Sequence, residues 1–287
     1  MCIRDSHFGS GVIRDFDSFY RYLIENQAVF FPGSFMLKLQ MSNKAALEVL
    51  SNSANAMTYK VTIPEGFRAV QIFEELSRIS GIPEDEFKSV AEDLESFAIP
   101  REAKTIEGYL FPATYSFDTE ATATEIIAAM VQRMKDELAR FEVAESNWHE
   151  VLTLASIVQR EAKLEADFFK VSRVFANRIE KGMKLETDPT ISYSYSGKDM
   201  SDLPRQQQLD HGYNTYLIEG LPPGPIASPG ALALEATLNP VDGDWLFFVT
   251  INLASGETKF SRTLAEHESW VVFLRQWERE NPNWYDE

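Results

Sequence analysis

Glu161 ends an apolar stripe on a predicted helix. Leu154, Ile157 and Val158 share one helix face, and Glu161, seven residues after Leu154, falls on that same face. Partial desolvation and a place near a helix C-terminus both disfavour the charged form of a carboxyl group. A carboxyl that stays protonated near neutral pH can act as a general acid on a glycosidic bond. The alternative is a structural Glu161 that bends out to water or pairs with a neighbouring basic residue.

A second carboxylate would complete the set for hydrolysis. Glycoside hydrolysis ordinarily uses two carboxylates, and Asp188, in the segment 185–190, is the strongest partner for Glu161. The sequence has no metal-ligand motif, because the four histidines are scattered without ligand spacing and Cys2 is the single cysteine. The chain also lacks a phosphate-binding or dinucleotide-binding loop and a nucleophile elbow. The sequence therefore predicts neither a metal nor a cofactor.

The elements that must position these residues belong to an α+β protein. Hydrophobic periodicity and turn residues predict helices at 16–26, 70–79, from about 83, at 124–141, 148–162, 166–181, up to 238, and at 264–279, with strands at 57–63, 245–252 and 258–262. Residues 185–190 and 220–230 are predicted loops, and 193–210 is a polar stretch. We divide the chain into a leader (1–11), a small α+β region (12–56), a subdomain with connecting helices (57–142) and a catalytic domain (143–287).

Composition limits the possible partners. The 287 residues include 27 Lys plus Arg against 44 Asp plus Glu, a net charge of −17, which disfavours nucleic acid and anionic lipid surfaces as partners. An uncharged or zwitterionic glycan remains compatible with this charge. No stretch reaches the about 18 continuous apolar residues of a membrane span. A single cysteine excludes an internal disulfide without deciding the compartment.

Seven short motifs occur in an order that resembles a known family. They are VTIPEG (61–66), EGYLFP (107–112), ASIVQRE (155–161), VFANR (174–178), LETDPT (185–190), YNTY (213–216) and GLPPGPI (220–226). Together they resemble the endolytic murein transglycosylase family, also called the YceG-like family, from about residue 12 to about residue 275. The segment 57–95 is similar to the LysM-like subdomain of that family, with a packing domain that binds no ligand as the alternative.

The resemblance implies a lytic transglycosylase that cleaves the MurNAc–GlcNAc β-1,4 bond within peptidoglycan strands and terminates the elongation of nascent strands. Such an enzyme needs one obligatory carboxyl group, because the C6 hydroxyl of the substrate is the nucleophile and closes a 1,6-anhydro-MurNAc end. Peptidoglycan strands, and cell-wall synthesis proteins, are the implied partners. The implied location is the extracytoplasmic (periplasmic) face of the cytoplasmic membrane, reached by an N-terminal anchor that we expect to be missing from this chain.

By resemblance the catalytic residue is Glu161. Many relatives carry a second acidic residue where this chain has Gln159, but residue 159 lies roughly 160° round the helix from residue 161, away from the apolar stripe. The supporting or substrate-binding candidates are Asn177, Glu186, Asp188, Thr190, Tyr213, Asn214 and Tyr216.

Each supporting candidate has a structural alternative. Asn177 can instead fix a neighbouring loop, and the tyrosines can be ordinary buried rings. Asp188 can be a turn residue, and Thr187 and Thr190 can close that turn. Two rival functions also stay open: a peptidoglycan hydrolase that uses Glu161 with Asp188, and a non-catalytic glycan-binding or scaffold protein.

Overall fold

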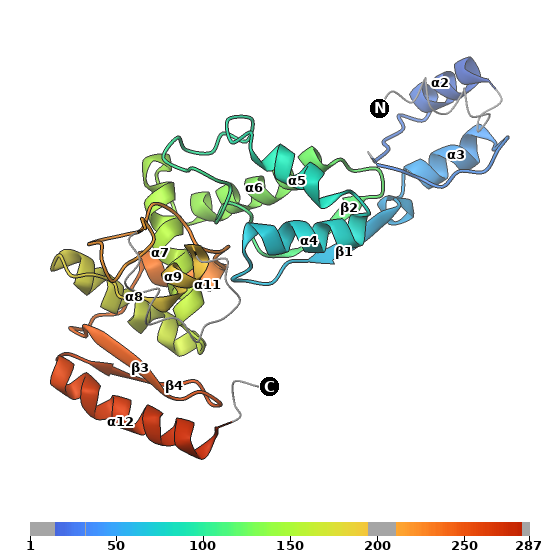
Figure 1. The fold of residues 1–287 in the computed structure, drawn as a ribbon. Helices are drawn as coiled ribbons and strands as arrows, with labels where there is room; N and C mark the ends of the chain where they lie inside the picture. The colour runs from blue at the N-terminus through green and yellow to red at the C-terminus, as the bar shows by residue number, and fades with distance from the viewer. Residues whose placement is uncertain (1–14, 32, 195–210, 283–287) are drawn as a thin grey trace.

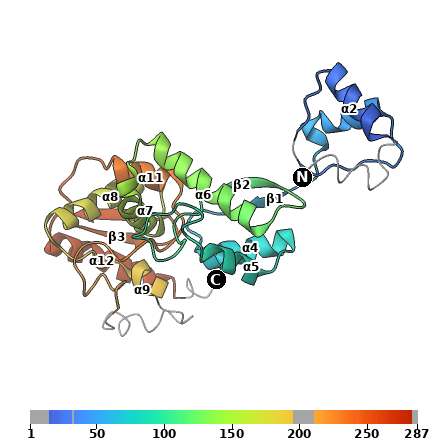
Figure 2. The ribbon, with the colours of Figure 1, turned by 90° about the horizontal axis from the view of Figure 1, so that it is seen from above.

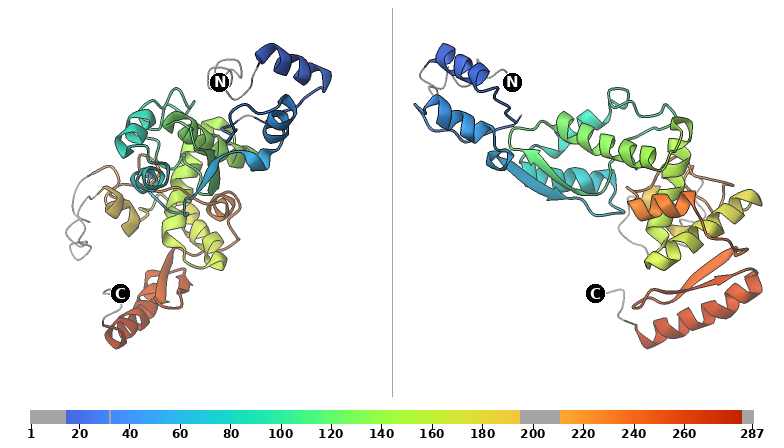
Figure 3. Two further views of the ribbon diagram at one scale, coloured as in Figure 1. Left: turned by 90° about the vertical axis from the view of Figure 1, so that its right-hand side faces the viewer. Right: turned by 180° about the vertical axis from the view of Figure 1, so that it is seen from behind.

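The structure, a computed structural model, describes residues 15–31, 33–194 and 211–282. Its first part contains α2 (Phe16–Glu25), α3 (Asn43–Leu50) and the short 3-10 helix η1 (Ser53–Asn55). Asp15 caps α2 and Ser42 caps α3 through side-chain oxygens that accept backbone N–H groups. A small core of Phe19, Ala46 and Leu50 holds this part together. Figures 1 and 3 show it at the opposite end of the molecule from α12.

The second part is built on a two-stranded antiparallel sheet. β1 (Thr58–Thr62) pairs with β2 (Thr114–Asp118), so that Thr58 faces Asp118 and Thr62 faces Thr114. Between the strands lie α4 (Ala69–Ser80) and α5 (Glu84–Ala91), and α6 (Ala123–Arg140) follows β2. Gly81 ends α4 in the left-handed conformation at φ 78°, which glycine adopts without a steric penalty.

The third part carries the helices of the site. α7 (Trp148–Glu161) follows the 3-10 helix η2 (Glu145–Asn147), and α8 (Glu165–Glu180), α9 (Asp188–Ser194) and α11 (Ala231–Leu238) complete this group. α11 packs on both α7 and α8, as Figure 2 also shows. Ala233, Leu234 and Ala236 of α11 are fully buried, because this short helix is apolar on nearly all sides.

A β-hairpin and one long helix form the last layer. β3 (Phe247–Asn252) pairs with β4 (Glu257–Ser261) in antiparallel order, with an irregularity in the register near Asn252. α12 (Leu264–Glu280) packs along β3, and Figure 3 shows the helix and hairpin beneath α8. The strands β3 and β4 therefore connect α12 to the rest of the protein.

One buried core extends through the second and third parts. It runs from Val61 of β1 to Ala236 of α11 and includes Trp148 at the start of α7, inside the predicted catalytic domain. Gly108 shows how closely these parts approach, since its φ is +82° and an added Cβ would lie 2.4 Å from Pro225 Cβ. The division between residues 142 and 143 stays a prediction, but residues on both of its sides share this core.

The α+β class is confirmed, and most predicted elements lie within about two residues of their observed bounds. Three points need correction: the helix α3 and the strand β2 were not predicted, and the expected loop 185–190 turns into helix α9 at Asp188. Pro189 lies in the first turn of α9, where its missing N–H costs no hydrogen bond. The leader 1–11, and 195–210 of the polar stretch, lie outside the described residues. Among the described helices, none has the length and apolarity needed to cross a membrane.

Candidate active site

A cavity of about 390 Å³ lies beside the end of α7. Glu161 of α7 and Arg178 of α8 contribute to it, and the segment from Leu185 to Asp188 forms another side. The hairpin and α12 close it with apolar and aromatic side chains, among them Phe247 and Phe248. With Tyr216, the cavity therefore joins residues from six separate segments, and the carboxyl group of Glu161 faces it.

The environment of Glu161 favours its protonated form. The apolar stripe behind it is in place, since Ile157 and Val158 are fully buried. Burial raises the pKa of Glu161 to about 7, although a hydrogen bond from the Thr187 hydroxyl opposes the rise. The negative charge of Asp188 raises this pKa further, and Arg160 lowers it. Glu161 is therefore a carboxyl group that can hold and release a proton near neutral pH.

Neighbouring charged and polar residues point elsewhere. Gln159 accepts a hydrogen bond from the backbone N–H of Gly230 at 2.9 Å, on the opposite side of α7 from the cavity. Arg160 Nη1 donates to the carbonyl oxygen of Gly66 at 3.4 Å. Gln159 thus anchors the loop before α11, and a Glu at this position would not reach the cavity.

A network of threonines shapes the turn that faces Glu161. Glu186 adopts φ 51°, an uncommon conformation for a non-glycine residue, and its N–H donates to Thr215 O at 3.1 Å. Thr187 N donates to Thr215 Oγ1 at 3.0 Å, and Thr190 Oγ1 donates to Thr187 O at 2.7 Å. Thr190 and Thr215 also bond through their hydroxyls at 2.9 Å. These bonds fix the backbone of Thr187, so its hydroxyl is held toward Glu161.

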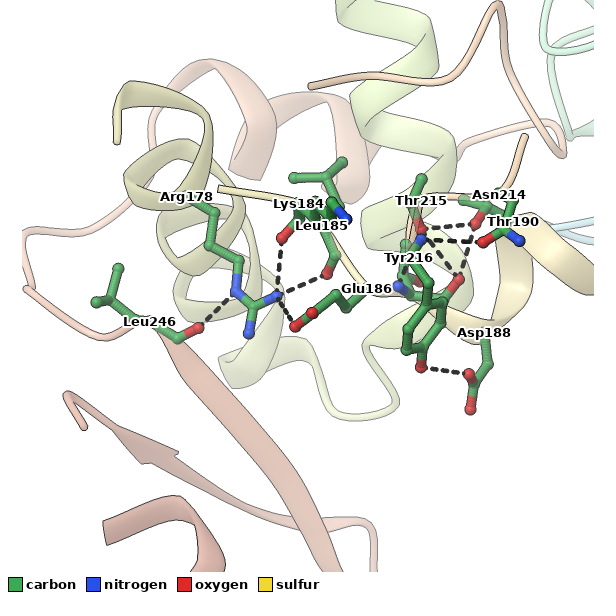
Figure 4. Close-up of polar contacts among 11 residues, drawn as sticks. Arg178, Lys184, Leu185, Glu186, Asp188, Thr190, Asn214, Thr215, Tyr216 and Leu246 are labelled. Atoms are coloured by element: carbon green, nitrogen blue, oxygen red, sulfur yellow. Dashed lines mark hydrogen bonds and ion pairs between the residues drawn. The ribbon is translucent and has the colours of Figure 1, made fainter. Parts of the chain in front are cut away.

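Asp188 and Tyr216 form the other polar wall of the cavity. The Tyr216 hydroxyl donates to Asp188 Oδ1 at 2.6 Å, and both residues line the cavity (Figure 4). Burial and the bond to Asp188 raise the pKa of Tyr216, so its hydroxyl keeps its proton. Asp188 thus presents a carboxylate oriented by Tyr216 on the same cavity as Glu161.

Arg178 connects two walls of the cavity. Its Nε donates to Leu246 O at 2.7 Å, just before β3, while Nη1 donates to Lys184 O and Leu185 O, each at 3.0 Å (Figure 4). Nη1 also pairs with Glu186 at 3.1 Å. The guanidinium group lies over the ring of Phe247, 5.0 Å from its centroid. A single side chain from α8 therefore holds the hairpin and the 184–186 segment in one arrangement.

Among the predicted site residues, Glu161, Glu186, Asp188 and Tyr216 line the cavity, and Thr190 supports it. Asn177, Tyr213 and Asn214 do not line the cavity. Asn177 Nδ2 donates to Gly243 O and Trp245 O at 3.0 and 2.9 Å, which is the loop-fixing alternative. Asn214 is fully buried and caps its own turn by accepting from Tyr216 N.

The segment 220–226 lies in the predicted loop 220–230, and none of its residues lines this cavity. It is instead anchored on α7, since Ile226 N donates to Ser156 Oγ at 3.0 Å and Pro223 O bonds His149 Nε2 at 2.8 Å. The Pro-rich and Gly-rich loop therefore packs against α7 and does not form a wall of the cavity.

The sequence did not single out Arg178, Thr215 or His267, and it gave Thr187 only a role in closing a turn. Arg178 belongs to the VFANR motif, so the motif itself was an available signal. His267 carried no signal because its partners come from distant segments, such as Phe247, whose ring lies 5.5 Å away. Burial and the charge of Arg178 lower the pKa of His267. Within the described ranges, no group of His, Cys, Asp and Glu forms a metal-binding cluster.

Fold and site together define an α+β protein with a proton-holding carboxyl group in a cavity of polar and aromatic side chains. Residues 5–272 match the YceG-like family, and the chain belongs to it. This match begins inside the predicted leader 1–11, so the residues from 5 onward belong with the family's sequence.

Two curated relatives and one solved structure resemble the chain. An endolytic murein transglycosylase of Bacillus subtilis (strain 168) is 31% identical over 280 residues, covering 89% of this chain and 76% of the relative. One of Streptococcus pneumoniae (strain D39) is 28% identical over 299 residues, covering 90% of this chain but 53% of the relative. The crystal structure of a YceG-like protein from Listeria monocytogenes superposes with a TM-score of 0.63 at 29% identity, over 92% of each chain.

Proposed function

We propose that this chain is an endolytic murein transglycosylase in which Glu161 is both the general acid and the general base. The observation that carries the proposal is the cavity carboxyl group itself, whose pKa burial raises to about 7. The relatives named endolytic murein transglycosylase support the reaction class. A carboxyl group with this pKa is divided between the two forms near neutral pH, and the reaction needs each form in turn.

The reaction divides into two proton transfers at one residue. Protonated Glu161 gives its proton to the glycosidic oxygen as the bond from C1 of the muramic acid residue breaks. The resulting carboxylate then takes the proton of the C6 hydroxyl. At the same time the C6 hydroxyl oxygen bonds to C1 and closes the 1,6-anhydro ring. No water is consumed, and Glu161 ends protonated, ready for the next cut.

Neighbouring groups have defined parts in this scheme. The Thr187 hydroxyl donates to Glu161 and stabilises the carboxylate that exists between the two transfers. The carboxylate of Asp188, held by Tyr216, faces the same cavity and stabilises positive charge that develops on the sugar ring. Arg178 holds the walls together and does not itself reach a reacting atom in this proposal.

Product analysis tests the proposal. Purified chain is incubated with intact peptidoglycan strands, and the new ends are identified by mass spectrometry. The expected products carry 1,6-anhydro-MurNAc ends from cuts within strands, each lighter by one water than the hydrolytic product. A folded chain that leaves the strands uncut would refute the enzyme and favour a glycan-binding or scaffold protein.

A hydrolase that uses Glu161 with Asp188 is the second candidate, because both carboxyl groups line one cavity and Asp188 raises the pKa of Glu161. Digestion in isotopically labelled water separates the two reactions, since only hydrolysis places labelled oxygen in the new ends. If most of the new ends carry labelled oxygen, the chain is a hydrolase and the transglycosylase proposal is wrong.

We also propose that the protein acts on nascent strands at the extracytoplasmic face of the cytoplasmic membrane and terminates their elongation. Depletion of the protein in its host should then lengthen newly made glycan strands. Unchanged glycan strand lengths after depletion would refute this cellular role, and the proposed reaction at Glu161 would still stand.

A further inference from the structure

A second cavity, of about 460 Å³, lies in the β1–β2 part of the protein. We name it the α4–α5 pocket. Phe73 of α4, Ala91 of α5, and Leu94 and Ile106 of the following segment give it a largely apolar wall. It shares no lining residue with the cavity at Glu161. A ligand of the α4–α5 pocket must therefore offer apolar groups to this wall.

Basic side chains surround the pocket. Lys104 is exposed, and within the part of the chain that the structure describes its side chain has no ion-pair partner. Lys88 pairs with Glu84 and Asp85 on its own helix, and Glu92 adds an acidic group to the lining. Arg68 stacks over the ring of Tyr193 at 4.6 Å and donates to its carbonyl oxygen at 2.9 Å. Lys104 thus offers the pocket a positive charge that no ion pair within the described residues engages.

Glu107 provides a buried polar group in the pocket. It is only 4% exposed, and the backbone N–H of Ala69 donates to its Oε1 at 2.9 Å. Burial raises the pKa of Glu107 to about 7, so its carboxyl group can either donate or accept a hydrogen bond near neutral pH. An amide, which carries both a donor and an acceptor, matches such a group.

Helix α9 connects the two cavities. Asp188 at its start lines the cavity at Glu161, and Tyr193 near its end lines the α4–α5 pocket. Five residues of helix separate them, which corresponds to roughly 8 Å along the helix axis. The two residues are also roughly 140° apart around the helix, so a substrate that occupies both cavities must pass around α9.

We propose that the α4–α5 pocket binds the peptide side chain of the murein strand while Glu161 acts on the sugar bond. The inference rests on the proposed function, and it adds that the stem peptide contributes to the affinity of the protein for its strand substrate. A stem peptide has small apolar side chains, backbone amides and free carboxylates, which match the apolar wall, Glu107 and Lys104. A strand stripped of peptides keeps acetamido groups and lactyl carboxylates but has no amino-acid side chains to meet the apolar wall, so it fits this pocket less well.

The test compares two substrates and three proteins. The substrates are peptide-bearing strands and the same strands stripped of peptides by an amidase. The proteins are the wild type, Lys104→Glu, and the control Lys60→Glu, which reverses an exposed charge on β1 that lines neither cavity. Wild type and Lys60→Glu should show a KM about tenfold lower for peptide-bearing strands, the effect of one charge-assisted bond. Lys104→Glu should abolish this preference and cleave stripped strands at the wild-type rate.

Failure of the inference and failure of the proposed function give different results. Equal KM values of the wild type for both substrates would overturn the peptide site while leaving the transglycosylase intact. If the wild type cleaves neither substrate, the enzyme proposal fails, and a titration with the peptide released by the amidase decides the pocket. The peptide site is supported if the released peptide binds saturably to the wild type and to Lys60→Glu but not to Lys104→Glu. The site is refuted if the released peptide does not bind to the wild type.

Discussion

Replacing Glu161 with Gln should inactivate the protein and stabilise it above neutral pH. The two side chains are nearly isosteric, and a Gln oxygen can still accept the hydrogen bond from Thr187. Gln cannot exchange the catalytic proton, so we expect a loss of about 10²-fold or more in kcat. The same change removes the need to bury an ionised carboxylate. Activity and stability should therefore move in opposite directions.

The size of the stability effect follows from the pKa of Glu161. Burial raises it from its usual 4.5 to about 7, and each pKa unit corresponds to about 1.4 kcal/mol, so ionising Glu161 in the fold costs at most about 3.5 kcal/mol. Because Glu161 is partly exposed to the cavity, we expect about 1 to 3 kcal/mol. Between pH 4.5 and 7 the folded wild type binds more protons than the unfolded chain, so its stability falls as pH rises.

Thermal unfolding at pH 4, 6 and 8 measures this effect. Glu161→Gln and the wild type should have equal Tm values at pH 4, and the variant should gain several degrees by pH 8. Glu150→Gln makes the same change at an exposed position of the same helix and is the control, with wild-type activity and no pH-dependent gain. A Glu161→Gln advantage that is the same at every pH would refute the buried-acid reasoning, and full activity in the folded variant would refute the catalytic assignment.

Four further outcomes are expected. The wild-type kcat/KM should fall as pH rises above about 7, because the acid form of Glu161 is lost, and a flat profile up to pH 9 would contradict this. Thr187→Val removes the donor that lowers this pKa, so the falling limb should shift to higher pH. Gly108→Ala places a Cβ against Pro225 at positive φ and should cost at least about 2 kcal/mol in chemical denaturation. Arg178→Lys loses the forked bonds that join hairpin and turn, so kcat should drop more than the free energy of unfolding.

Local patterns in the sequence predicted most of the elements. The helix that carries Glu161 was predicted from hydrophobic periodicity as residues 148–162 and is observed as Trp148–Glu161. Its apolar face also placed Gln159 on the opposite side, where that residue now bonds Gly230. Helix periodicity sufficed for helices with one buried face, such as α4, α6 and α7, because the residues of that face are close together in the sequence.

Two of the elements that the sequence missed, β2 and α9, have clear physical reasons. β2 is five residues long with a single buried side chain, Phe117, so its pattern is weak and its pairing with β1 defines it. The Asp188–Pro189 pair is typical of a turn, and it also suits the first turn of a helix. Tertiary contacts favour the helix over the turn. At the start of α9, the Asp188 carboxylate accepts a hydrogen bond from Tyr216, and the Thr190 hydroxyl bonds to the Thr215 hydroxyl.

The sequence by itself predicted Glu161 as the acid, and it determined the helix that carries Glu161 and the face on which it lies. Only the tertiary structure decided that this acid is buried enough to hold a proton near pH 7, because burial depends on segments that are distant along the chain. Thr187, its hydrogen-bond donor, is 26 residues away, and the hairpin that closes the cavity is held by Arg178 through Leu246, 68 residues further on. Periodicity reports which face of a helix is apolar, whereas a pKa depends on every group that surrounds the carboxyl in space.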